Sequence, residues 1–285
     1  MLDAAMKQNF EETGYLLVRE ALSVNQLTAL KSKFTEWVED SRQHTEPFGE
    51  TYDGRPRFDI EPGHNPAKPA LRRVASPVDM SPAYYEAMKN NGALTLLTEL
   101  LTPNIRFHHC KINSKLPGAA TAVKYHQDFM FEPHTNADLA TVLFFLDDVT
   151  LDNGPLEVVP GSHKGELHSL WHDGVFTGAV GSTVEKNAQA ASIPCTGKAG
   201  DACIMHSRLL HGSAPNRSMG SRTLFICCYA AADALPLSPN PLPTKIAGEI
   251  VAGAETTEIR SEHFVVELPE VPTGASFFSQ QQKVQ

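Results

Sequence analysis

Apolar residues recur at helical spacing in two stretches of the N-terminal third of the chain. The first stretch follows Ser23–Gln26, which has the form of a capping box, and its apolar side chains fall on one helical face. The second starts at Ser81-Pro82, a typical N-cap and first helical residue, and runs towards Leu101. Both predict helices that pack on the core. Before them, Tyr15–Val18 is a short apolar run that is typical of a strand.

From residue 105 the pattern changes to short apolar runs separated by turn clusters such as Asp152–Pro155. Strands are predicted at 105–113, 122–127, 140–147, 155–159, 201–206 and 222–230. Many short strands at this spacing favour a sandwich or a barrel, and the jelly roll is one option. The fold class is therefore expected to be mostly β with flanking helices.

Three stretches lack a clear period. Residues 44–80 are rich in Pro, Gly, Arg and Asp and predict a long loop, which in a compact domain is usually functional. Residues 160–200 are rich in Gly, Ser, His and Ala and are expected to form an insert or a lid. The tail from Pro269 onward is expected to be frayed. No clear helical segment follows residue 105.

We expect one domain over residues 1–285. Its parts are a helical N-terminal part (1–104) that carries an active-site loop at 44–80, a jelly-roll core (105–230) that contains the insert, and a C-terminal extension (231–285).

Composition narrows the class of protein. With 285 residues and 41% hydrophobic residues, the chain can bury a full core. A net charge of −9 argues against a nucleic-acid binder, although a locally basic pocket could still take a small anion. We find no signal peptide and no apolar run long enough to span a membrane, so we expect a cytoplasmic monomer or homodimer. The five cysteines are odd in number and form no C-x-x-C pair, so they are expected to be buried free thiols.

His126 and Asp128 are the first candidate metal ligands. They lie at the end of a predicted strand, and on a strand residues two apart point to the same face. One imidazole and one carboxylate would then meet a single ion, and a third ligand would complete a facial triad with open positions, as iron(II) oxygenases require. A single His-x-Asp pair is weak support, because it arises easily by chance.

Two histidines compete for the third position. His206 and His211 both follow the apolar run at 202–205. His211 leads into Gly212-Ser213, and Arg222 lies eleven residues further on, where a guanidinium could clamp a carboxylate with two parallel hydrogen bonds. His206 lacks that spacing, so His211 is preferred on its sequence context.

These residues together resemble the phytanoyl-CoA dioxygenase family, and the resemblance covers nearly the whole chain. It is carried by the segments Phe10–Val18, His126–Asp128, Asn153–Leu156, Pro160–His163 and His211–Ser213, together with Arg222. The ordered set is far more specific than any single segment. The resemblance implies a double-stranded β-helix core of the jelly-roll, cupin-like type, with helices packed outside.

The resemblance also implies the cofactors and their ligands. Iron(II) would be bound by His126, Asp128 and His211, and Arg222 with Ser213 would hold the distal carboxylate of 2-oxoglutarate. Ectoine hydroxylases, a bacterial branch of the family, carry a strand that ends in Ile-Asn, so Asn113 is expected to contact the cosubstrate. A family glutamine four residues earlier is replaced by His109, which either takes over its hydrogen bond or packs as a strand residue.

Asp128 points to the type of reaction. Related halogenases have a small residue in place of this carboxylate, so halogenation is not expected here. The resemblance implies hydroxylation of an unactivated C–H bond, with dioxygen and 2-oxoglutarate as cosubstrates and succinate and CO2 as products. Desaturation or ring closure by the same chemistry stays open, since each depends on how the substrate is held.

Four residues are candidates for contact with the substrate. Arg72 and Arg73 could recognise an acid group or could be solvated loop charges. Phe131 could form a pocket wall or pack in the core, and Trp171 could cover the site or pack under a loop. An amino-acid-like zwitterion, a phosphonate or a secondary metabolite would fit as substrate. The rival hypotheses are a cupin-type metalloenzyme without a 2-oxo acid and a non-catalytic jelly-roll binding protein.

Overall fold

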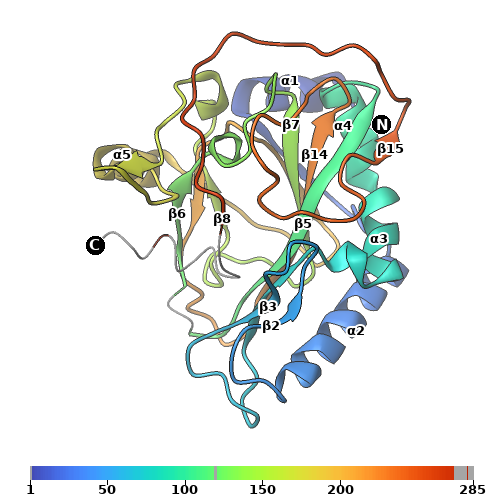
Figure 1. The fold of residues 1–285 in the computed structure, drawn as a ribbon, viewed down its shortest axis with the longest axis vertical. Coiled ribbons are helices and arrows are strands. Elements are labelled where there is room, and N and C mark those ends of the chain that lie inside the picture. The colour runs from blue at the N-terminus through green and yellow to red at the C-terminus, as the bar shows by residue number, and fades with distance from the viewer. Residues whose placement is uncertain (1, 119–120, 273–280, 282–285) are drawn as a thin grey trace.

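Two antiparallel sheets form the centre of the computed structural model, which describes residues 2–118, 121–272 and 281 (Figure 1). The larger sheet has the order β1 (Tyr15–Val18), β12 (Ala202–His206), β7 (Leu139–Phe145), β14 (Arg222–Ala231), β5 (Ile105–Lys115), β4 (Leu71–Ala75), β3 (Pro56–Ile60) and β2 (Phe48–Glu50), with β15 (Ile250–Ala252) paired to β5. The smaller sheet has the order β11 (Ile193–Cys195), β8 (Leu156–Val158), β13 (His211–Ser213) and β6 (Val123–His126). The chain is mostly β, as its sequence predicts.

The larger sheet is covered on both faces, and β14 shows this directly. Phe225 and Tyr229 belong to the core on the helical side, whereas Leu224 and Ile226 pack towards the smaller sheet. Because side chains alternate between the faces of a strand, a strand covered on both sides is buried at every position. This explains the unbroken apolar run that the sequence shows here.

Helices form the outer layer beside the larger sheet (Figure 1). They are α1 (Ala4–Thr13), α2 (Val24–Ser41), α3 (Pro82–Lys89) and α4 (Gly92–Leu100). The capping box of α2 is confirmed: the Ser23 hydroxyl accepts from the Gln26 amide at 3.2 Å, and the Gln26 side chain accepts from the Ser23 amide at 3.0 Å. Trp37 of α2 stacks on Tyr84 of α3, with ring centroids 5.3 Å apart.

The helix boundaries differ from the prediction in three places. The single helix predicted towards Leu101 is two helices, because the Asn91 side chain accepts from the Leu94 amide at 2.8 Å and caps a new one. The first helix, α1, was not predicted; Asp3 caps it through the Met6 amide. The expectation of no helix beyond residue 105 is also wrong, since α5 (Ser182–Ala191) lies in the predicted insert.

The loop predicted at 44–80 is wrong over much of its length, because β2, β3 and β4 extend the larger sheet there. Charged residues hide the strand pattern. Arg72 donates from Nε to Asp59 Oδ2 at 2.7 Å and from Nη1 to Glu61 Oε2 at 3.1 Å, so cross-strand ion pairs stabilise this edge where apolar pairs would be expected. The six strands predicted within 105–230 are confirmed within a few residues. Four short strands in this range were not predicted: β9 (Trp171–His172), β10 (Val175–Phe176), β11 and β13.

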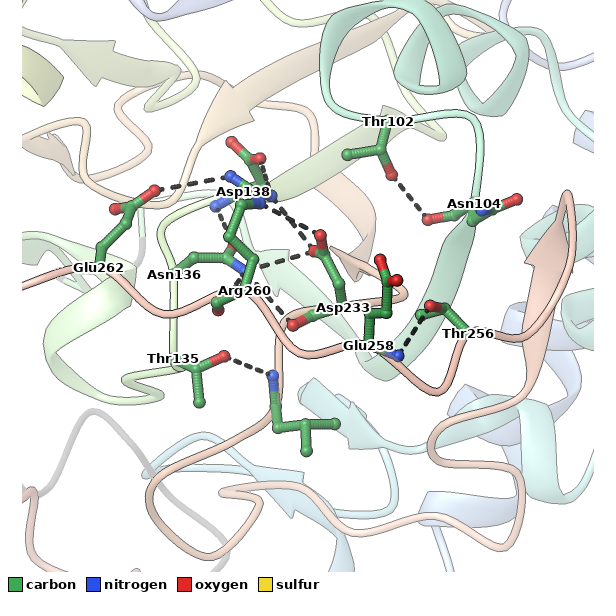
Figure 2. Close-up of polar contacts among 11 residues, drawn as sticks. Thr102, Asn104, Thr135, Asn136, Asp138, Asp233, Thr256, Glu258, Arg260 and Glu262 are labelled. Carbon is green, nitrogen blue, oxygen red and sulfur yellow. Dashed lines mark hydrogen bonds and ion pairs between the residues drawn. The ribbon is translucent and has the colours of Figure 1, made fainter.

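The C-terminal segment beyond β15 runs as irregular coil over the top of the molecule in Figure 1 and then down towards β6 and β8. Arg260 fastens it: the guanidinium pairs with Asp138 and, at 3.1 Å, with Asp233, while the Asn136 amide donates to the Arg260 carbonyl at 3.1 Å (Figure 2). The Glu262 amide continues the attachment by donating to the Thr135 carbonyl at 2.8 Å. Residues 273–280 of the tail predicted to be frayed lie outside the described residues, but 269–272 are described.

The five cysteines are buried and none forms a disulfide, as predicted. Among the described residues, no helix is both long and apolar enough to cross a membrane.

Candidate metal centre and cavity

His126, Asp128 and His211 come together between β6 and β13 of the smaller sheet. His126 and His211 face each other in register, with ring centroids 4.2 Å apart. Their Nε2 atoms lie 3.5 Å and 3.6 Å from Asp128 Oδ1. The spacing of His126 and Asp128 is interpreted from the sequence as strand geometry. In the structure, β6 ends at His126, and Asp128 is the first residue of a 3-10 turn just after it. The three ligand atoms still meet on one side, as a facial triad requires.

Backbone hydrogen bonds turn both imidazoles towards the centre of the triad. His126 Nδ1 lies 2.8 Å from the Lys124 carbonyl, and His211 Nδ1 lies 2.9 Å from the Leu209 carbonyl. A carbonyl can only accept, so each Nδ1 carries the proton and each Nε2 offers a lone pair. Burial, followed by the nearby His126 ring, lowers the pKa of His211 to about 4, which keeps its imidazole neutral.

Asp128 is ionised despite its position. Burial acts to raise its pKa, but the two imidazoles outweigh burial and hold the pKa well below its ordinary value. Its second oxygen, Oδ2, accepts a hydrogen bond from the Thr141 hydroxyl at 2.7 Å, which fixes the direction of the carboxylate. Two neutral imidazoles and one anionic carboxylate, with no fourth ligand among the residues that the structure describes, are the donor set of non-haem iron(II) centres, so the residues fit the metal.

A Thr141→Val variant should bind Fe(II) about 10-fold more weakly, because losing the partner of a ligating carboxylate usually costs 10- to 100-fold in metal affinity or activity. Anaerobic calorimetric titration of the metal-free protein with Fe(II) measures this. Thr223→Val is the matched control: Thr223 hydrogen-bonds to Ser114 at 2.9 Å within the same sheet and does not line the metal cavity. Equal metal affinity in both variants would contradict the role of Thr141.

The triad opens into a cavity of about 260 Å³ between the two sheets. Polar side chains of β5 line it at every second position: His109, Lys111, Asn113 and Lys115. The C-terminal segment supplies Glu270, Val271 and Pro272 to the lining, and the region predicted as an active-site loop supplies Thr51, Arg55, Pro56, Arg73 and Ala75. No residue of the predicted lid, 160–200, is among the described lining residues.

Two buried basic side chains lie side by side at one end of the cavity. Arg222 at the start of β14 is in register with Lys115 at the end of β5. Arg222 donates to the Gly154 carbonyl at 2.9 Å, and its Nε is buried without a partner. Lys115 donates to Ser213 Oγ at 2.7 Å. Burial and then the Arg222 charge lower the pKa of Lys115 to about 6, and burial lowers the pKa of Arg222 to about 10.

The turn at Gly154 places a backbone carbonyl where Arg222 can donate to it. Gly154 has a φ of +74°, and a Cβ at this position would lie 2.4 Å from the Ala214 carbonyl oxygen. Asn153 holds the turn from the other side, since its side chain donates to the Asp148 carbonyl at 2.7 Å and accepts from the Thr150 amide at 2.9 Å. The Asn-Gly segment therefore acts as scaffold for the guanidinium.

A cluster of titratable groups lies beside the triad. His109 Nε2 is 2.7 Å from Glu132 Oε2, and His108 Nε2 is 3.1 Å from the same oxygen. Consecutive strand residues normally point to opposite faces, but a β-bulge at His108 brings both rings to one side. Burial acts to raise the pKa of Glu132, but His109 and His108 outweigh it and hold the pKa well below its usual range.

The Glu132 cluster has the composition of a second metal site, but its geometry is that of a hydrogen bond. Two atoms that bind one ion at a right angle lie about 3 Å apart, whereas His109 and Glu132 are at 2.7 Å and the ligands of the first site are at 3.5–3.6 Å. We therefore describe the cluster as a buried carboxylate that two imidazoles hold in place.

The predicted substrate residues divide into two groups. Arg73 and Phe131 line the cavity, and the Phe131 ring lies edge-on to His126 with centroids 5.4 Å apart. Arg72 and Trp171 do not line it among the described residues. Trp171 Nε1 instead donates to the Leu268 carbonyl at 3.1 Å, so it contacts the segment that leads to Glu270.

His206, the rejected candidate for the third ligand, lies away from the triad. Its ring packs against Phe10 and His163, with centroids 6.4 Å and 5.3 Å apart. Sequence reasoning did not single out several polar lining residues: Lys111, Ser114, Lys115, Glu132, Thr141 and Glu270. Period-two spacing of polar residues along β5 was the available signal for the two lysines.

The two-sheet fold, with a His-Asp-His triad that opens into a cavity with buried basic side chains at one end, defines a non-haem iron enzyme. Comparison with known proteins agrees: the profile of the family described as phytanoyl-CoA dioxygenase (PhyH) matches residues 10–224. The chain belongs to this family. It is a 2-oxoglutarate-dependent non-haem iron dioxygenase, with iron(II) as cofactor and 2-oxoglutarate as cosubstrate.

The similar proteins span several activities. A probable alpha-ketoglutarate-dependent hypophosphite dioxygenase of Stutzerimonas stutzeri is 33% identical over 241 residues, which cover 82% of this chain and 80% of that protein. The L-proline trans-4-hydroxylase of Streptomyces griseoviridis is 28% identical over 222 residues, covering 71% of this chain and 81% of that protein. The crystal structure of EctD from S. alaskensis with bound Fe superposes with a TM-score of 0.66 at 19% identity, covering 92% of this chain and 87% of that one.

Proposed function

We propose that this enzyme hydroxylates an unactivated C–H bond of a small polar molecule and releases succinate and CO2. The observation that carries the proposal is the layout of one cavity, which has the metal triad on one wall and the paired cations Arg222 and Lys115 at one end. A 2-oxo acid that binds the metal through one end needs a cationic partner for its distal carboxylate, and the cavity supplies one. The similar proteins named for hypophosphite and L-proline support a small substrate.

We assign the residues as follows. His126, Asp128 and His211 hold the iron, and Arg222 with Ser213 binds the distal carboxylate of 2-oxoglutarate. Lys115, which donates to Ser213, adds a second positive charge there, and a bound carboxylate would restore the proton that burial removes from its amine.

Asn113 and His109 are assigned to the part of the cavity between the two ends. Asn113 Oδ1 and His109 Nδ1 are both buried without a hydrogen-bond partner, and both residues line the cavity. Because buried polar atoms are rarely left unpaired, these atoms are suited to contact a bound ligand. Phe131 forms an apolar wall next to His126.

The chemistry divides between the cofactor and the protein. When bound, iron(II) with 2-oxoglutarate supplies the activation of dioxygen, so that one oxygen atom enters the substrate and the other enters succinate. The chain's own residues neutralise the distal carboxylate, hold the carboxylate of Asp128 in one direction through Thr141, and exclude bulk water from a cavity between two sheets. Asp128 also occupies the position that halogenases leave open, which favours hydroxylation.

The two sheets are proposed to be the halves of a double-stranded β-helix of the jelly-roll type. Strands 5 to 8 alternate between the sheets along the chain, as do strands 12 to 14. The likeness to EctD supports the same fold. We propose that residues 1–285 form one domain built from the parts 1–104, 105–230 and 231–285.

Turnover of 2-oxoglutarate without substrate tests the proposed function. With Fe(II), ascorbate and dioxygen, the purified enzyme should convert 2-oxoglutarate slowly to succinate, measured by chromatography of the acids. The His126→Ala variant supplies the background rate. A wild-type rate no higher than this background would favour a cupin-type metalloenzyme that uses no 2-oxo acid.

A further inference from the structure

Three more cations from the described part of the chain line the cavity beyond the pair assigned to 2-oxoglutarate. One of them, Arg55, is paired with Asp53 at 2.7 Å, which leaves Arg73 and Lys111. Arg73 on β4 is in register with Asn113, and Lys111 on β5 is in register with Ala75 on β4 and Ile226 on β14. Both side chains belong to the cavity lining. Their strands are neighbours in the larger sheet, so the two cations approach the same part of the cavity.

Arg73 is a buried guanidinium that lacks a full set of partners. The residue is 6% exposed, and its Nε has no hydrogen-bond partner. Asp59 is its partner in the strand register, but that carboxylate is already bound by Arg72 at 2.7 Å. An arginine carries donors in a rigid fork, and a buried fork left open towards a cavity is suited to receive an oxyanion.

Lys111 lies between the cation pair and the metal. The strand position is four residues from Lys115, or about 13 Å along β5, and two residues from His109. On β14, Cys228 pairs with His109 of β5 and with Thr141 of β7. The Thr141 hydroxyl contacts Asp128, so this end of β5 lies towards the triad. Among the described residues, Lys111 forms no ion pair, so its charge is available to a ligand.

One molecule of 2-oxoglutarate does not account for Arg73 and Lys111. Its distal carboxylate meets Arg222 and Lys115, and its other end meets the metal. Arg73 and Lys111 then stand over the remaining space, where the substrate must lie within reach of the iron and of Phe131. Two partly unpaired cations in a buried space favour a second anion.

We propose that Arg73 and Lys111 bind the acid group of the substrate, so that the enzyme oxidises a small oxyanion acid: a phosphonate, a phosphinate or a carboxylate. The inference rests on the proposed function and names the substrate class of the same site. The overall charge of the chain is −9, so the cavity is a local exception to an acidic protein. Neutral and purely cationic molecules of the same size should be poor ligands.

Stimulation of succinate release by a defined panel tests the proposal. The acids are methylphosphonate, 2-aminoethylphosphonate, propionate and β-alanine, and the matched non-acids are ethanolamine and propylamine. We expect at least one acid to raise the rate above the uncoupled rate, and neither amine to do so. For that acid, Lys111→Met and Arg73→Gln should each raise KM at least about 10-fold, as expected for a lost hydrogen bond to a charged group.

The affinity for 2-oxoglutarate separates this role from that of Arg222. The affinity for 2-oxoglutarate is measured in uncoupled turnover and in anaerobic titration of the Fe(II) enzyme. In both, Lys111→Met and Arg73→Gln should stay within about threefold of the wild-type affinity, a change smaller than the loss of one typical hydrogen bond would cause. Arg72→Gln is the matched control, since Arg72 sits on the same strand but pairs with Asp59 and Glu61. Arg73→Lys keeps the charge if Arg73→Gln does not fold.

The outcomes are distinct. If 2-oxoglutarate turns over normally and no acid stimulates it, or if an amine stimulates it equally, the acid-binding proposal is overturned while the proposed function stands. If Lys111→Met and Arg73→Gln weaken 2-oxoglutarate binding as much as they weaken the acid, the two cations serve the cosubstrate and the proposal is also overturned. Phosphonates and carboxylates are compared within the panel, which shows which acid group is preferred.

Discussion

Replacing His126 with alanine should abolish iron binding and turnover together. The imidazole is one of three ligands and its Nδ1 proton is held by the Lys124 carbonyl, so the lone pair on Nε2 is committed to the metal. Loss of a residue that only hydrogen-bonds to a metal ligand usually lowers metal affinity or activity about 10- to 100-fold. Loss of the ligand itself should therefore reduce Fe(II) affinity by more than about 100-fold. Anaerobic titration with Fe(II) and the rate of succinate formation measure the two effects.

His206→Ala is the matched control for this experiment. His206 is the last residue of β12, as His126 is of β6, and is half-buried, but it packs against Phe10 and His163 and lies away from the triad. We expect the control to lose some stability, measured by thermal unfolding, and to keep its Fe(II) affinity. A His126→Ala protein that is folded and still binds Fe(II) as tightly as His206→Ala would exclude His126 as a ligand.

The sequence predicted the triad and the strand β6 that carries His126, because both depend on local signals. The runs that became β6, β12 and β14 end in turn residues, so their position along the chain was readable, whereas β13 was not predicted because His211–Ser213 is short and not apolar. His211 was separated from His206 by its spacing to Ser213 and Arg222. The structure places His211 with Asp128, and His206 elsewhere.

The rest of the cavity depends on pairing between strands, which a single sequence does not reveal. Arg72 and Arg73 are adjacent and look alike, yet alternation along β4 sends one to Asp59 and Glu61 and the other to the cavity. Lys115 was also missed because the strand β5 was predicted to end at residue 113. The strand register places Lys115 opposite Arg222.

Glu132 and the C-terminal residues were missed for a related reason. Glu132 becomes part of the cavity because the bulge at His108 turns two histidines towards it, and a bulge leaves no clear mark in the sequence. Glu270 reaches the cavity because Arg260 fastens the preceding segment to Asp138 and Asp233 (Figure 2). Such long-range ion pairs have no local pattern.

Replacing Arg222 with glutamine should raise KM for 2-oxoglutarate at least about 100-fold, because breaking a buried charge pair by removing one partner costs about 3–5 kcal/mol. The guanidinium is buried, is held by the Gly154 carbonyl and has a free Nε, so it is prepared for a carboxylate before one binds. Since the contact is far from the reacting atoms, kcat at saturating 2-oxoglutarate should fall much less than kcat/KM. Arg222→Lys should recover part of the affinity by keeping the charge without the fork.

Arg208→Gln is an unusually close control for this variant. Arg208 donates to the Gly165 carbonyl at 2.8 Å and also has a buried, unpaired Nε, but it does not line the cavity. A second comparison replaces the ligand: 2-oxobutyrate lacks the distal carboxylate, so wild type and Arg222→Gln should bind it equally weakly. If Arg222→Gln binds 2-oxoglutarate as tightly as Arg208→Gln does, the cosubstrate's distal end must bind elsewhere, and Arg73 with Lys111 would become the first alternative to examine.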